Sequence, residues 1–221
     1  MQFHKDRISE ILTFWFAGNQ RSNYRDKWFP SNLPVNGREG DSPQSRIDFV
    51  IYERFKADLV NAFNGEYSTW ISCIDNIQYV ETESDSNKEF ISDCLNSVVA
   101  FIILLDQFSR HIYRFEHLPT DSVERKDADL LAFGASQKIH ESSDARIKNA
   151  VFDLPLATLI FSIMPYRHNP TVVNLSFVME ALRSKERVDA EKSDLDKELL
   201  MKFQKQTIRR LQHLQDREMV R

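Results

Sequence analysis

Residues 98–115 read VVAFIILLDQFSRHIYRF, an apolar run that passes directly into a polar segment. The first eight residues are all apolar, and the following ones include an acid, an amide, two arginines and a histidine. Upstream, the apolar pattern reaches back to Lys88 and covers almost the whole helical circumference, which is typical of a helix that other elements contact on several sides. The stretch therefore predicts a central helix from Lys88 to Leu105 with a polar cluster at its end.

The rest of the chain predicts an all-α protein. Apolar residues recur at intervals of three and four, and five glycines and seven prolines are few for 221 residues. Helix pairs with short links favour a tetratricopeptide-like α-α superhelix or an irregular helical bundle, and no repeat period is visible. We expect Pro165 to end or kink one helix, and residues 81–87 to form an exposed acidic linker. The predicted helices cover residues 7–16, 43–63, 67–74, 88–105, 121–141, 147–164, 172–182 and 195–220.

The length favours a single helical domain over residues 1–221. The last predicted helix has no stop signal, so the hypothesis that the chain is the N-terminal module of a longer protein stays open. Residues 19–41 predict a long loop that Trp28 and Phe29 pin to the core. No apolar run approaches the roughly 20 residues of a membrane helix, and no signal peptide opens the chain. We expect no membrane contact and a cytoplasmic or nuclear location, of which the cytoplasm is our prediction.

Composition argues against several classes of function. The net charge of −4 provides no global field for nucleic acid, so no nucleic-acid partner is expected. Cys73 and Cys94 lack metal-ligand spacing and are expected to be free and buried. The sequence contains no HExxH, GxSxG, GxGxxG or phosphate-loop motif, and we predict neither a metal nor a cofactor.

The polar segment after the central helix is the first candidate site. On a helix its side chains form one broad polar surface, which suits an anion or a carbonyl group. The arginines offer forked donors, the amide adds another, and Asp106 orients an arginine or acts as a base. The structural alternative is that these groups only satisfy neighbouring helix ends. The candidate residues are Asp106, Gln107, Arg110, His111, Tyr113 and Arg114.

A second polar cluster, MPYRHNP at residues 164–170, also follows an apolar helix. If the two helices are neighbours, Arg167 and His168 lie beside Arg110 and His111, and they join the candidate ligand-binding residues. The candidates for acid or base chemistry are then Asp106 and His168.

Two segments carry a family resemblance. LLDQFSRHIYR at 104–114 and LPLATLIFSIMPYRH at 154–168 resemble an uncharacterised all-helical, tetratricopeptide-like family whose hallmarks are LDQFPRNIYRG and MPLEHSE. The resemblance implies an α-α superhelix used for binding, with no established activity or cofactor. His111 and Phe115 depart from the first hallmark, and Arg167 stands where the second has an acid. The residues that match are Asp106, Gln107, Phe108, Arg110, Ile112, Tyr113, Arg114, Met164, Pro165 and His168.

Three functional hypotheses follow. The leading one is a helical module that binds a protein or peptide partner through a concave surface around Asp106 to Arg114. The alternative is an enzyme acting on a small anionic substrate, a phosphate or a carboxylate. Its binders would be Arg110, Arg114 and Arg167, and His168 or Asp106 would be the acid or base. The third is a scaffold without a site of its own.

Overall fold

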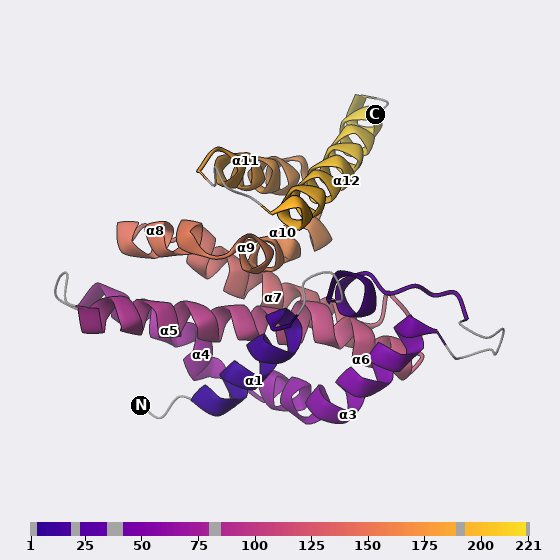
Figure 1. The fold of residues 1–221 in the computed structure, drawn as a ribbon, viewed down its shortest axis with the longest axis horizontal. Helices are drawn as coiled ribbons and strands as arrows, with labels where there is room; N and C mark the ends of the chain where they lie inside the picture. Colours follow the sequence, from indigo (N-terminus) through magenta and orange to yellow (C-terminus); the bar gives the residue numbers. More distant parts are fainter. Residues whose placement is uncertain (1–3, 19–22, 35–41, 80–84, 189–192, 220–221) are drawn as a thin grey trace.

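The computed structural model describes residues 4–18, 23–34, 42–79, 85–188 and 193–219. This part of the chain is helical and contains no strand, which confirms the all-α prediction. The helices form stacked layers, with α5 running through the middle, α11 and α12 outermost on one side and α3 outermost on the other (Figure 1). The elements are α1 (Lys5–Phe16), η1 (Tyr24–Trp28), α3 (Pro43–Phe63), α4 (Ser68–Asn76), η2 (Ile77–Tyr79), α5 (Asp85–Ile102), η3 (Ile103–Phe108), α6 (Ser109–Phe115), α7 (Val123–His140), α8 (Ala145–Asp153), α9 (Leu156–Ser162), α10 (Met164–His168), α11 (Val172–Val188) and α12 (Asp194–Met219).

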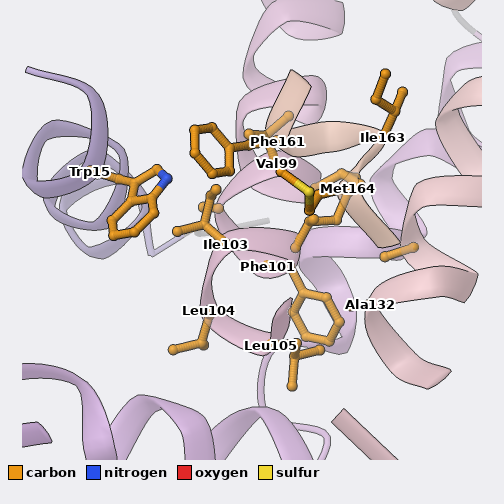
Figure 2. Packing of buried hydrophobic residues seen from close by; sticks show 14 of the residues in the cluster. Trp15, Val99, Phe101, Ile103, Leu104, Leu105, Ala132, Phe161, Ile163 and Met164 are labelled. Carbon is orange, nitrogen blue, oxygen red and sulfur yellow. The ribbon is translucent and has the colours of Figure 1, made fainter. Parts of the chain in front are cut away.

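The predicted central helix lies at the centre of the fold. Each residue from Val98 to Leu105 is buried, and α5 contacts α1, α4, α7, α8 and α9. Figure 2 shows Trp15 of α1, Phe161 of α9 and Met164 of α10 around Ile103. The helix begins at Asp85 rather than Lys88, so the end of the expected acidic linker is helical, while 80–84 lies outside the described residues.

The central helix changes its winding at the polar segment. Residues Ile103–Phe108 form a π-helix, and Ser109 resumes the α-helix as α6. A π turn leaves a backbone carbonyl without its usual partner, and here the hydroxyl of Ser109 donates to the carbonyl of Leu105. The sequence pattern predicted an uninterrupted α-helix. The wider turn changes the direction in which the residues after Leu105 leave the helix axis.

The helix expected at 147–164 is three helices. Leu154 ends α8 as its C-cap and Pro155 precedes α9, because proline lacks the N–H that a helix interior needs. Pro165 was expected to end or kink this helix, and α9 does end at Ser162; Pro165 itself lies in the first turn of α10, a position that favours proline. The short α10 carries Arg167 and His168.

The segment expected to be a long loop is partly helical. Its residues Tyr24–Trp28 form a π turn, and the indole nitrogen of Trp28 donates to the carbonyl of Trp15 at 3.1 Å. Trp28 is buried and therefore anchors the segment as predicted. Residues 19–22 and 35–41 lie outside the described residues. After them, Ser42 caps α3 by accepting from the backbone N–H of Ser45.

The end of α6 contains a strained residue. His117 has a φ of +57°, a left-handed conformation in which a side chain is disfavoured. Its N–H donates to the carbonyl of Arg114, and the N–H of Leu118 donates to that of Tyr113 at 2.8 Å. This pair of bonds is a Schellman motif, in which glycine usually occupies the position of His117.

Replacing His117 by glycine should stabilise the protein, because glycine adopts a positive φ without the steric cost of a Cβ. We expect His117→Gly to raise the free energy of unfolding by about 1 kcal/mol, measured by urea denaturation at pH 7. His117→Ala keeps the Cβ and should stay within about 0.5 kcal/mol of the wild type. A loss of stability in His117→Gly would mean that contacts of the imidazole outweigh the strain.

Candidate functional site

Asp106 is a fully buried carboxylate at the π turn. Its Oδ1 lies 2.6 Å from Nδ1 of His168 and accepts from Nη2 of Arg110 at 3.3 Å. Its Oδ2 accepts from the amide of Gln107. The structure therefore brings together Asp106, Gln107, Arg110 and His168, which come from two separate segments of the sequence.

The charge state of Asp106 follows from these contacts. Burial alone would raise the pKa of its carboxyl group, but the charge and hydrogen bond of His168, followed by Arg110 and Gln107, outweigh burial and lower the pKa to about 2. The carboxylate is thus ionised at neutral pH, and Nδ1 of His168 must carry a proton to bond it. Nε2 of His168 has no protein partner among the described residues, and the side chain is 21% exposed.

Two further arginines surround this pair. Nη2 of Arg110 also donates to Asp129 of α7 at 2.5 Å, while its buried Nε has no partner. Within the described chain, the guanidinium of Arg125 has no hydrogen-bond partner, and burial and the charge of Arg110 lower its pKa. Asp129 is half-buried, and burial raises the pKa of its carboxyl group. The cluster therefore places two arginines and two carboxylates around His168.

Arg167 is 5% exposed and has no carboxylate partner among the described residues. Its Nη1 approaches the sulfur of Met164 at 3.5 Å, its Nη2 donates to Gln206 at 3.1 Å, and its Nε bonds nothing. Burial and the charge of Arg210 lower the pKa of Arg167 to about 10, although the charge of Asp106 opposes them. A buried guanidinium with so few acceptors is unusual, because burying an unpaired charge is costly.

His111 and Arg114 belong to a different cluster, centred on the buried Asp48 of α3. Oδ1 of Asp48 lies 2.7 Å from Nδ1 of His111 and accepts from Gln44 at 2.7 Å, and Oδ2 accepts from Nε of Arg114 at 2.9 Å. Burial, which outweighs Asp48, lowers the pKa of His111. Tyr113 takes no part in either ion cluster: its hydroxyl donates to the carbonyl of Glu124 at 3.4 Å.

The expected single polar surface is therefore divided in two. Helix α6 lies between α3 and α7 and contacts both. Arg110 and Tyr113 bond α7, whereas His111 and Arg114 bond α3. Sequence reasoning missed Asp48, although a lone acid three residues before the core residue Ile51 was a usable signal.

A pocket of about 710 Å³ opens beside the Asp48 cluster. The side chain of Arg114 is 46% exposed, and its two Nη groups have no partner among the described residues, because only Nε bonds Asp48. Two exposed phenylalanines, Phe49 and Phe115, form part of the wall with ring centroids 5.7 Å apart. The pocket is lined by Asn32, Ser42, Gln44, Ser45, Arg46, Asp48, Phe49, Arg114, Phe115 and His117.

Replacing Asp106 by asparagine should destabilise the protein, because Arg110 and His168 lose their buried counter-charge. We expect a loss of about 3 kcal/mol at pH 7 in urea denaturation. The depressed pKa of Asp106 means that its stabilisation is present above pH 4 and lost as the pH falls toward 2. The difference in the free energy of unfolding between wild type and Asp106→Asn should therefore shrink by about 1 kcal/mol between pH 7 and pH 3.

Asp129→Asn is the matched control for this measurement. Burial raises the pKa of Asp129. The difference in the free energy of unfolding between wild type and Asp129→Asn should therefore not shrink between pH 7 and pH 3. An unchanged difference for Asp106→Asn from pH 7 to pH 3 would show that the ion pair with His168 does not stabilise the fold.

The comparisons with known proteins place the chain in a family. No match is found among curated proteins or among solved structures. A family model described as "Bacterial protein of unknown function (DUF924)" matches residues 11–215, a span that includes both polar clusters. Because this match covers nearly the whole chain, the protein belongs to that bacterial family of unknown function.

Proposed function

We propose that the protein is a helical binding module and that the pocket beside Arg114 takes an acidic group of a peptide or protein partner. The observation that carries this proposal is the orientation of Arg114. Asp48 holds the guanidinium through Nε alone, and both Nη groups remain without a partner in the described part of the chain. A guanidinium fixed at one nitrogen offers its other donors in the fork geometry that suits a carboxylate.

The aromatic wall of the pocket supports a peptide rather than a small ion. Phe49 is half exposed, and the ring of Phe115 packs at a tilt against both Phe49 and Tyr52, with a centroid distance of 4.5 Å to Tyr52. Grouped exposed aromatic side chains commonly mark interaction sites. An apolar side chain of the partner would pack on these rings while a neighbouring acid bonds Arg114.

The size of the pocket and the arrangement of the helices agree with this proposal. A volume of about 710 Å³ lies in the range of ligand sites. The layered helices in Figure 1 favour a tetratricopeptide-like α-α superhelix, in which stacked helices present an extended surface to a partner. In this arrangement the partner contacts α3 and α6, on one flank of the predicted concave surface.

A library of short peptides that each place an acid beside an aromatic residue would test the proposal. Wild-type protein should bind members of this library, and Arg114→Gln should weaken binding about tenfold to a hundredfold, because a charge-assisted bond is lost. Fluorescence anisotropy of labelled peptides measures the change. Peptides in which the acid is replaced by its amide should bind the wild-type protein no more tightly than they bind Arg114→Gln.

Arg54→Gln is the matched control variant. Arg54 lies on α3, the helix that carries Asp48. Its side chain is 45% exposed, close to the 46% of Arg114, and it bonds Glu10 away from the pocket. Its replacement should leave peptide binding unchanged. If Arg54→Gln and Arg114→Gln lose the same amount of peptide affinity, the loss reflects the overall charge of the protein and not the pocket. If the wild type binds no peptide of the library, the proposal is contradicted.

A second candidate function rests on the pair of Asp106 and His168. Asp106 fixes Nδ1 of His168 and thereby leaves Nε2, without a protein partner in the described residues, as a base. With Arg167 included, three arginines lie around the carboxylates of Asp106 and Asp129, and this excess of positive charge would attract an anionic substrate. The enzyme hypothesis therefore retains Arg110 and Arg167 as binders, whereas Arg114 lies in the other cluster.

Hydrolysis of a panel of phosphate and carboxylate esters would test this second candidate. Here Nε2 of His168 takes a proton from the attacking water, so His168→Gln should lower kcat by about a hundredfold. His213→Gln changes an exposed histidine of α12 and should keep full activity. Turnover that survives in His168→Gln, or no turnover on the whole panel by wild type, would argue against this function.

A further inference from the structure

Helices α10 and α12 meet at a seam where positive charge collects. Arg167 lies at the end of α10, and Gln206 and Arg210 lie on α12. Nη1 of Arg210 donates to the backbone carbonyl of Arg167 at 2.9 Å, so the two arginines are neighbours. The start of α12 lies beside α10 in Figure 1, and its later part extends away from the stack.

The donors of Arg167 far exceed its acceptors. A guanidinium has five N–H groups, and this one meets an amide oxygen at 3.1 Å and a thioether sulfur at 3.5 Å. A thioether is a weak acceptor, and the buried Nε has none. The ring of Phe203, whose centroid lies 4.8 Å from the guanidinium carbon, offsets only part of the cost of burial.

No carboxylate at the seam balances these charges within the described chain. Asp106 is the one acid whose charge acts appreciably on Arg167, and it is already bonded to His168, Arg110 and Gln107. The exposed side chain of Arg210 bonds only the carbonyl of Arg167 among described residues. Two neighbouring cations with unused donors form the kind of pair that an anion commonly bridges.

We propose that the seam between α10 and α12 binds a small oxyanion, with the chemistry of phosphate or carboxylate, between the guanidinium groups of Arg167 and Arg210. The anion takes the place of the thioether as the acceptor for Arg167. Because the side chain of Arg210 is exposed, it turns toward the anion at little cost. The site is separate from the Arg114 pocket, which lies between α3 and α6, and its ligand ties α12 to the rest of the fold.

Isothermal titration calorimetry of the whole chain with inorganic phosphate, and separately with succinate at equal ionic strength, tests this site and distinguishes the two anion chemistries. We expect saturable binding of at least one of them. Arg210→Gln should weaken that binding about tenfold or more, because it removes a charge-assisted contact without disturbing the core. Arg209→Gln, an exposed neighbour on the same helix, should bind as wild type does.

Thermal unfolding gives the second readout. The bound anion should raise the Tm of wild type and Arg209→Gln by a few degrees more than that of Arg210→Gln. Phosphate also stabilises folded proteins in general, but this effect raises the Tm of wild type, Arg209→Gln and Arg210→Gln equally and so cancels when their Tm shifts are compared. Arg167→Met removes a buried unpaired charge, so without anion its Tm should equal or exceed that of wild type, and it should lose the anion response.

The proposal is overturned if wild type shows no saturable binding of either anion, or if Arg209→Gln weakens binding as much as Arg210→Gln does. It is also overturned if Arg167→Met folds and keeps the full anion response. Because Arg210 is exposed, its variant keeps the proposal testable even if Arg167→Met fails to fold.

Discussion

The buried carboxylate of Asp106 is the interaction on which the centre of the fold depends. It lies where the apolar central helix widens into a π turn, and it accepts from donors on that helix and on α10. Arg110 extends the network to Asp129 of α7. Four elements, η3, α6, α10 and, through Arg110, α7, are thus joined around one charge that water cannot reach. Such a charge is tolerated because His168, Arg110 and Gln107 all donate to it or face it, and removing the carboxylate itself would leave these donors without their shared acceptor.

Asp48 repeats this arrangement on the other flank of α6. Each carboxylate holds a cationic or titratable side chain by one nitrogen and leaves another nitrogen without a protein partner in the described residues: Nε2 of His168 and the Nη groups of Arg114. Structural and functional interpretations of these residues are therefore compatible. The bond that satisfies the buried acid also fixes the direction in which the remaining donors or lone pair are presented.

Most of the helices, and the identity of the polar residues, could be predicted from the sequence. Helical periodicity and proline are local signals, so the central helix and the start of α3 appear in the pattern. The grouping of the polar residues could not be predicted, because it depends on the π turn after Ile102 and on the position of α6 between α3 and α7. Asp48 and Asp129 lie on those two helices, and only packing makes them neighbours of the motif.

The net charge of the chain differs from the local charge around its buried carboxylates. The whole chain carries −4, which argued against a nucleic-acid surface. Yet Arg110, Arg125 and Arg167 lie around Asp106 and Asp129, and Arg210 lies beside Arg167. Because salt screens exposed charges beyond roughly 8 Å, a small anion responds to this cluster rather than to the net charge. An acidic protein can therefore still attract anions at one seam, and charge placement rather than composition decides which ligands it admits.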